Sequence, residues 1–480
     1  MQFSQTYGWR GDWVPWRFSW TVILLIQLIL GLSAFILPPL YAVSLIAVPV
    51  FLVVLYLSPI LSLSFLLISV LMEQVPLVSF GGIDLRLVEI AVALVLIGWL
   101  LNGVKDRTMR VDIRDTEIPL FFLMGWAFLS IVWAISLSRG VLLSVKLVSA
   151  FLVYFLVISL VKDKKSFNAQ LIIWICVGII FSFAGIYQAI TSGVGALAEV
   201  PLVQGEVAHL GKTVRATTIF FETPNGLAFV LSITIILTMV YYLLTPSLKV
   251  KIFLILSMVL MFSVLAITFS RKSWLAVVIG MLIIGLKNRK LLLIGLVSPF
   301  MAIIPLLFSN FGSYGEALYN RIMSFFLPVE VSMSGRVATW SIALDTFWNH
   351  PIIGNGLGYF GAVASQLNSP LPMVHNLYLY LITEIGLVGI TLFLLVIISF
   401  TVRLFKICMK SRDPAVQLIS VGIIAGFFVI LFQGVFRNIG LADPITWAYF
   451  GMISSFFRIW PVLEGHPNTH KQALITSEKG

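Results

Sequence analysis

Long apolar segments alternate with short polar connections along the chain. Many of these segments reach about 20 residues, the length of helix that spans the roughly 30 Å hydrocarbon core of a bilayer. Two of the runs are short, so the pattern predicts twelve to fourteen transmembrane helices. The fourteen apolar runs are 19–37, 40–57, 59–73, 85–101, 118–137, 141–161, 170–190, 226–244, 252–269, 273–286, 291–308, 376–401, 415–435 and 443–460.

Two connections, 191–225 and 309–375, are much longer than the rest. Ordered loops of this length are usually functional. Within the second, the stretch "SGRVATWSIALDTFWNHP" begins with a potential cap, Ser334, and is followed by Pro351, which predicts an amphipathic surface helix. Its apolar positions, spaced three and four residues apart, are Val337, Trp340, Leu344 and Phe347.

The glycines of "GNGLGYF" follow this predicted helix. A nucleotide-binding fingerprint needs a preceding strand and a following helix, and the sequence indicates neither. We predict a flexible turn that returns the chain to the membrane.

The predicted elements divide the chain into three parts. They are 1–308, with helices and the loop 191–225; 309–375, a large loop; and 376–480, with the last helices and a tail.

Composition agrees with a membrane protein: 60% of the residues are hydrophobic, 11% are charged, and the mean hydropathy is +1.05. The net charge of +11 does not indicate a nucleic-acid partner, because the basic residues form short clusters between apolar runs. With both termini cytoplasmic, 21 of the 31 Lys and Arg residues fall on the inside, so both long loops are predicted outside. Cys176 and Cys408 lack metal-ligand spacing and are expected to be packing residues.

Four residues from remote segments gather on the predicted outer face: Arg215, Arg271, Arg336 and His375. The planar fork of arginine suits phosphate oxygens, and a neutral imidazole can take a proton from a hydroxyl. Together they indicate transfer from a diphosphate-linked donor to an alcohol.

Each of these residues also has a plainer interpretation. Arg271 can extend from a helix end to lipid headgroups, and Arg336 can be a solvated charge on a helix face. Arg215 can be a turn residue paired with Glu222, and His375 can be an ordinary interfacial residue.

Glu384 lies inside an apolar run, where a carboxylate is functional by default. Asn376, Tyr380 and Glu384 follow at four-residue spacing and share a polar stripe, whereas His375 lies partly around the helix. We therefore assign Glu384 an orienting or structural role. Lys272, next to Arg271, is a possible supporting cation.

Four ordered motifs between about 215 and 400 are "RATTIFFETPNGLA", "SRKSWLA", "GRVATWSIALDTFWNHPIIGNGLGYF" and "HNLYLYLITEIGLVGITLF". Together they resemble the O-antigen ligase and O-antigen polymerase superfamily of bacterial envelope enzymes. The resemblance implies an all-α integral membrane glycosyltransferase of the GT-C type with a large helical periplasmic loop. Such an enzyme takes a saccharide from undecaprenyl diphosphate at the periplasmic face of the cytoplasmic (inner) membrane and joins it to an acceptor hydroxyl. The resemblance implies no cofactor and, for the ligases, no metal.

Carried onto this sequence, the resemblance makes His375 the general base, and Arg271 and Arg336 the ligands of the leaving diphosphate, joined by Arg215. The arrangement of motifs favours the ligase branch, in which the acceptor is lipid A–core. A polymerase, whose acceptor is the growing glycan, is the alternative. A transporter of lipid-linked sugars is less favoured, because no internal repeat is evident and the polar residues gather at one face.

Overall fold

The computed structural model describes most of the chain from residue 58 onward. Apart from Ser58, all of the described residues belong to one unit, Pro59–Gly480. The described residues are 58–72, 76–80, 83–106, 113–191, 223–287, 334–364, 366–369, 371, 373–437 and 441–463.

The first part of this region is a series of helices interrupted by one small hairpin. Its elements are α3 (Pro59–Leu71), β1 (Pro76–Phe80), β2 (Ile83–Arg86), α4 (Leu87–Asp106), η1 (Asp115–Glu117), α5 (Ile118–Leu129), η2 (Ser130–Trp133), α6 (Leu137–Leu160) and α7 (Lys164–Thr191). The strands pair antiparallel, with Phe80 opposite Ile83. This hairpin was not among the elements predicted from the sequence, although the intervening Gly81–Gly82 pair is a hairpin signal.

The second part contains the remaining helices. They are α8 (Pro224–Leu244), α9 (Leu248–Ile267), α10 (Arg271–Lys287), α13 (Ser334–Phe347), α14 (Tyr359–Val363), α15 (Leu377–Lys410), α16 (Pro414–Gly434) and α17 (Pro444–Leu463).

The predicted all-α membrane fold is confirmed in the described region. Each apolar run that falls there is largely helical, and eight segments are long and apolar enough to cross a membrane. The runs 19–37, 40–57 and 291–308 lie outside the described residues, so the total of twelve to fourteen spans stays a prediction. The division into 1–308, 309–375 and 376–480 also stays a prediction.

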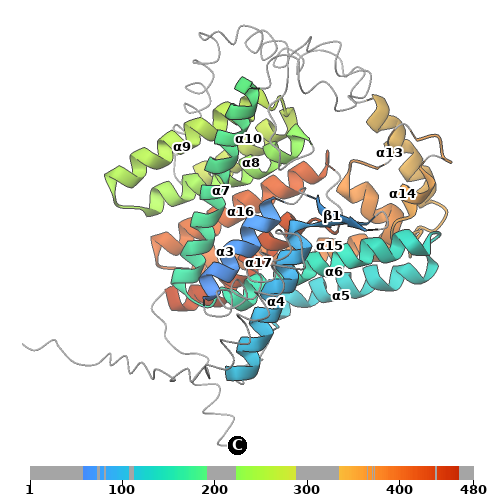
Figure 1. Ribbon diagram of the computed structural model, residues 1–480, viewed down its shortest axis with the longest axis horizontal. Coiled ribbons are helices and arrows are strands. Elements are labelled where there is room, and N and C mark those ends of the chain that lie inside the picture. The colour runs from blue at the N-terminus through green and yellow to red at the C-terminus, as the bar shows by residue number, and fades with distance from the viewer. Residues whose placement is uncertain are drawn as a thin grey trace, which may run out of the picture. The chain divides into compact units, whose positions relative to one another are not determined.

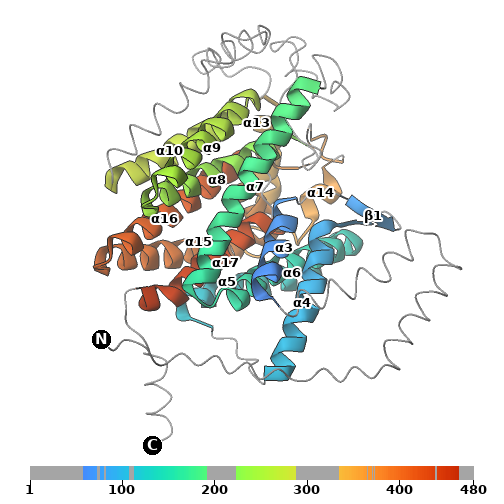
Figure 2. The ribbon, with the colours of Figure 1, turned by 60° about the vertical axis from the view of Figure 1, so that its left-hand side comes forward.

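Helices α8, α9, α10 and α16 lie side by side, and α8 is the most enclosed of them (Figure 2). Its residues are apolar on every side, which is typical of a helix surrounded by other helices. The start of α8 is set by the Thr223 side chain, which accepts a hydrogen bond from the backbone N–H of Gly226, and by Pro224 at the first turn.

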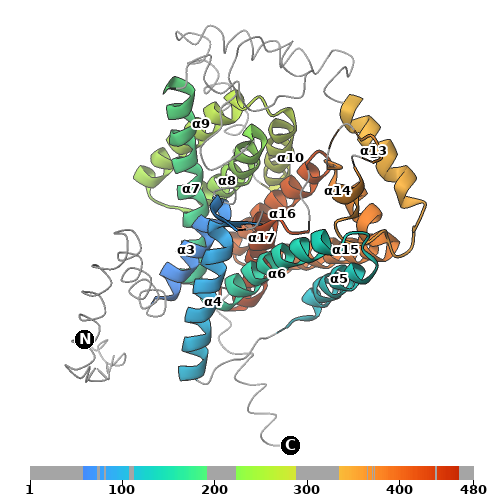
Figure 3. The ribbon, with the colours of Figure 1, turned by 45° about the vertical axis from the view of Figure 1, so that its right-hand side comes forward.

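Helices α13 and α14 pack at one end of α15 (Figures 1 and 3). Their small core consists of Ala343, Phe360, Ala364 and Val374. The helix predicted from Ser334 is confirmed, but its predicted buried face is only partly right. Val337 and Leu344 are 53% and 42% exposed, while Thr339 and Ala343 are fully buried. Small side chains face α15 here because they let two helix backbones approach closely.

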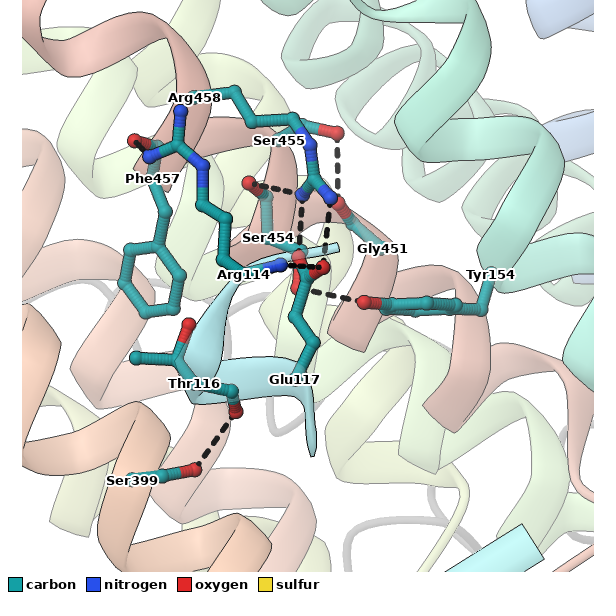
Figure 4. A network of polar contacts seen from close by, with 10 residues as sticks. All are labelled: Arg114, Thr116, Glu117, Tyr154, Ser399, Gly451, Ser454, Ser455, Phe457 and Arg458. Atoms are coloured by element: carbon teal, nitrogen blue, oxygen red, sulfur yellow. Dashed lines mark hydrogen bonds and ion pairs between the residues drawn. The ribbon is translucent and has the colours of Figure 1, made fainter. Parts of the chain in front are cut away.

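The opposite end of the bundle is joined by a buried ion pair (Figure 4). Arg458 of α17 donates from Nη1 and Nη2 to the two carboxylate oxygens of Glu117, at 2.5 and 2.8 Å. The backbone N–H of Arg114 donates to the same carboxylate, and the Arg114 guanidinium donates to the carbonyl of Phe457. This network connects the start of α5 to the end of α17.

Candidate active site

The candidate site lies where the starts of α10 and α15 meet the end of α16. Ser273 Oγ donates to Gln433 Oε1 (2.7 Å), and Gln433 Nε2 donates to Ser232 Oγ of α8 (2.7 Å). The Tyr378 hydroxyl donates to the carbonyl of Leu431 (2.9 Å). These buried bonds fix the helices relative to one another at this end of the bundle.

His375 immediately precedes the cap of α15, and its backbone has φ = 52°. Few residues other than glycine adopt this left-handed conformation, which costs roughly 1–2 kcal/mol. Two contacts hold the chain on either side of it. The Asn376 side chain caps α15 by accepting from the backbone N–H groups of Tyr378 and Leu379 (2.9 and 3.1 Å). Trp340 Nε1 donates to the carbonyl of Val374 (3.0 Å).

Two cations act on the imidazole of His375. Burial, and then the positive charges of Arg336 and Lys272, lower its pKa to about 4. The ring is therefore neutral at pH 7 and can accept a proton or a hydrogen bond. Lys272 is held in place by a hydrogen bond from its Nζ to the carbonyl of Phe436 (3.0 Å).

The other two predicted phosphate ligands are Arg271 and Arg215. Arg271 is half-buried and begins α10, one residue before Lys272. The turn before it contains Phe269, which is buried and has φ = 52°. Arg215 lies outside the described residues, so its relation to His375 stays a prediction.

Glu384 is fully enclosed, and its carboxylate faces the start of α14. Its carboxylate accepts hydrogen bonds from the backbone N–H groups of Gly358, Tyr359 (3.1 Å) and Phe360 (2.9 Å), at the start of α14. A carboxylate matches these donors in charge as well as geometry. The structural role predicted for Glu384 thus has a concrete form: it binds α14 to α15.

The expectation of a flexible turn at "GNGLGYF" was wrong. A short helix, α14, follows the glycines, and the loop before it is bonded to α15. Asn355 donates from its backbone N–H and from Nδ2 to the carbonyl of Thr383 (both 3.0 Å). The backbone N–H of Gly356 donates to the carbonyl of Glu384 (2.9 Å). The loop is therefore fixed on the helix along several residues.

These bonds are possible because α15 is interrupted at Gly386, whose φ and ψ are 68° and −168°. The interruption frees backbone groups that must be paired inside an apolar bundle. The carbonyl of Ile385 accepts from Trp126 Nε1 (2.9 Å). The N–H groups of Leu387 and Val388 donate to the carbonyls of Pro351 and Ile352.

Glycine is required at the crossing of loop and helix. A Cβ on Gly386 would lie 2.4 Å from the backbone N of Gly354 and from the carbonyl O of Ile352. A Cβ on Gly354, whose φ is also positive, would lie 2.4 Å from the carbonyl O of Glu384. Each side chain would meet backbone atoms that cannot move aside.

A family model described as O-antigen ligase matches residues 256–394. Over these residues the chain resembles the O-antigen ligase and polymerase superfamily. No curated protein matches the sequence. The O-antigen ligase match runs from α9 through the interruption of α15, so it includes Arg271, Lys272, Arg336 and His375. It does not include α8, α16 or α17.

The match supports a membrane glycosyltransferase family of the O-antigen ligase and polymerase type, and the eight helices of membrane-spanning length in the described region agree with it. The family's substrates are lipid-linked glycans and polysaccharides at a membrane. Among the described residues, no group of three or more His, Cys, Asp or Glu side chains is arranged to hold a metal ion.

Sequence reasoning missed three residues that shape the site: Trp340, which holds the carbonyl before His375, and Asn355 and Gly386, which hold the loop on α15. Trp340 had been assigned only to an apolar face. A glycine in an apolar run was the available signal for the interruption, but glycine alone does not distinguish a break from close helix packing.

Proposed function

We propose that the protein transfers a saccharide from undecaprenyl diphosphate to an acceptor hydroxyl at the periplasmic face of the bacterial cytoplasmic membrane. The observation that carries this proposal is a neutral, half-buried imidazole flanked by Arg336 and Lys272, at an end of the bundle where several helices meet. Such an arrangement combines a proton acceptor with positive charge for a phosphate leaving group.

In the proposed reaction, His375 accepts the proton of the acceptor hydroxyl. The hydroxyl oxygen forms a bond to the anomeric carbon of the donor sugar, and the bond from that carbon to the phosphate oxygen breaks. The leaving diphosphate takes the electron pair. Arg336, Arg271 and Lys272 stabilise its negative charge, and Arg215 joins them from the shorter loop. No cofactor or metal ion is needed, so we expect EDTA to leave transfer unchanged.

The donor also changes the basicity of His375 in this proposal. In the free protein burial, together with the charges of Arg336 and Lys272, keeps its pKa near 4, which makes the ring a weak base. A bound diphosphate brings negative charge beside the same cations, and a neighbouring negative charge raises the pKa of a histidine. Donor binding thus prepares the base for the acceptor.

We assign the acceptor to lipid A–core, as in the ligases. The polymerase alternative shares the donor and the proposed base, and only the acceptor distinguishes the two. In cells lacking this protein, loss of a ligase leaves long polymer on undecaprenyl diphosphate and bare lipid A–core. Loss of a polymerase leaves lipid A–core capped by a single repeat, and that result would reject the ligase assignment.

The proposed orientation has both termini in the cytoplasm and the loops 191–225 and 309–375 in the periplasm. The distribution of Lys and Arg supports it. A cysteine introduced at Ser313 is expected to react with a membrane-impermeant reagent in intact spheroplasts. Reaction at Lys164→Cys instead, with Ser313→Cys protected, would reverse the orientation.

A further inference from the structure

Arg437, three residues beyond the end of α16, carries a guanidinium that the proposed mechanism does not use. Its Cζ lies 4.1 Å from the centre of the Phe229 ring in α8. Its Nη1 is buried and has no hydrogen-bond partner among the described residues. The ring stabilises the cation but offers no acceptor to the N–H groups. A buried donor of this kind requires an explanation, and a bound anion supplies one.

The residue before Arg437 connects it to the candidate active site. The carbonyl of Phe436 accepts the hydrogen bond from Lys272 Nζ (3.0 Å). The Phe436 ring centre lies 6.5 Å from that of Trp340, whose indole holds the residue before His375. Arg437 therefore directly follows the residue that binds Lys272, one of the two cations that act on His375.

We propose that Arg437 binds a phosphate oxygen of the isoprenoid diphosphate in the donor. This inference rests on the proposed function, because the diphosphate is the donor's. A guanidinium packed over an aromatic ring still directs its N–H groups outward in its own plane, where they suit bidentate binding of phosphate. Arg437 lies on the α8 side of the site, whereas Arg336 belongs to α13. The two guanidinium groups would therefore contact the diphosphate from different sides.

The test measures binding of farnesyl diphosphate to the full-length protein in phosphatidylcholine nanodiscs by calorimetry. Arg437→Gln is expected to weaken binding about tenfold or more, because it removes hydrogen bonds between charged groups. Arg437→Lys is expected to weaken binding less, since the charge remains and the fork is lost. Thermal unfolding is recorded for each variant. If the Gln variant does not fold, wild-type affinity in the Lys variant overturns the proposal.

Arg403→Gln is the matched control. Arg403 is also half-buried and its Cζ lies 6.0 Å from the centre of a phenylalanine ring, that of Phe457, near the opposite end of α15. Its substitution is expected to leave farnesyl diphosphate binding unchanged. Wild-type affinity in Arg437→Gln, or an equal loss in Arg403→Gln, would overturn the proposal.

A phospholipid headgroup presents the same phosphoryl oxygens, so the measurement is repeated with phosphatidylglycerol in the bilayer. The proposal predicts the same difference between wild type and Arg437→Gln in both bilayers. If Arg437 binds headgroups instead, phosphatidylglycerol weakens farnesyl diphosphate binding to the wild type and has no effect on the variant. Binding without any transfer activity in the wild type would reject the proposed function and leave this inference standing.

Discussion

Replacing Glu384 by Gln tests whether its carboxylate fastens the glycine loop and α14 to α15. One carboxylate oxygen accepts from Gly358 and Tyr359, and the other accepts from Phe360. A glutamine can place its carbonyl oxygen where it accepts from Gly358 and Tyr359, but its amide nitrogen, which is a donor, then faces the N–H of Phe360. One bond to a charged acceptor is lost, and one buried donor is left without a partner.

Hydrogen bonds to charged groups contribute about 1.5–3 kcal/mol, and an unpaired buried donor costs about 1–3 kcal/mol. The two contributions overlap, so we expect Glu384→Gln to weaken the attachment of α14 by about 2–4 kcal/mol. Because each 1.4 kcal/mol is a tenfold change in an equilibrium constant, local opening should increase roughly 30- to 700-fold. Transfer activity should fall as well, because α14 shares its packing with α13, which carries Arg336.

Hydrogen exchange of peptides covering 351–364, measured in nanodiscs, reports this opening directly. The control is Glu89→Gln, since Glu89 accepts a backbone N–H from Arg86 near the start of α4 (2.9 Å). That variant should leave exchange in 351–364 unchanged. Wild-type protection of this segment in Glu384→Gln would refute the role assigned to the carboxylate.

Three further predictions concern other parts of the molecule. Gly386→Ala should destabilise the protein severely, because its Cβ would lie 2.4 Å from backbone atoms. The control is Gly125→Ala, which should not destabilise it, since nothing lies within 4 Å of a Cβ at that position. Equal unfolding temperatures for the two variants would contradict this prediction. Protonation of His375 should abolish transfer, so kcat/KM for the donor should stay constant from pH 7 to about 5 and fall near pH 4, with the acid limb of kcat at higher pH. An acid limb of kcat/KM near 6.5 would be inconsistent with the lowered pKa. Glu117→Gln should lower the free energy of unfolding by about 3–5 kcal/mol, since it leaves Arg458 without its buried partner, and should not change KM.

The helices could be predicted from the sequence because apolar runs of membrane-spanning length have few alternative structures. The interruption of α15 could not. Gly386 lies in a continuous apolar run, and the groups that pair with the freed backbone are Trp126 and residues 351–356, remote in the sequence. Only the folded structure shows that Trp126 and residues 351–356 lie beside the interruption.

The face that α13 turns toward α15 could not be predicted from the sequence either. Its two possible stripes have the same spacing, and hydrophobicity favours the one with Val337 and Leu344. The stripe with Thr339 and Ala343 is buried instead, and the Thr383 hydroxyl donates to the carbonyl of Ala343 (3.1 Å). Close approach to α15 decides between them.

For the candidate site, residue chemistry pointed to His375 and its cationic neighbours, because only ten of the 31 Lys and Arg residues fall on the predicted outer side. Arg437 was not singled out, since it belongs to no recognised motif. Its contact with Phe229 arises from the packing of the end of α16 against α8.

The central claim is that His375 is the base of a glycosyl transfer, and the most direct test compares wild type with His375→Asn. Asparagine tolerates the left-handed backbone at this position, so the variant should fold like the wild type. The measurement follows transfer by the purified protein from an oligosaccharide on a lipid diphosphate to lipid A–core, on gels that separate the products. We predict transfer by the wild type and none by a folded His375→Asn variant. Undiminished transfer by His375→Asn would contradict the account.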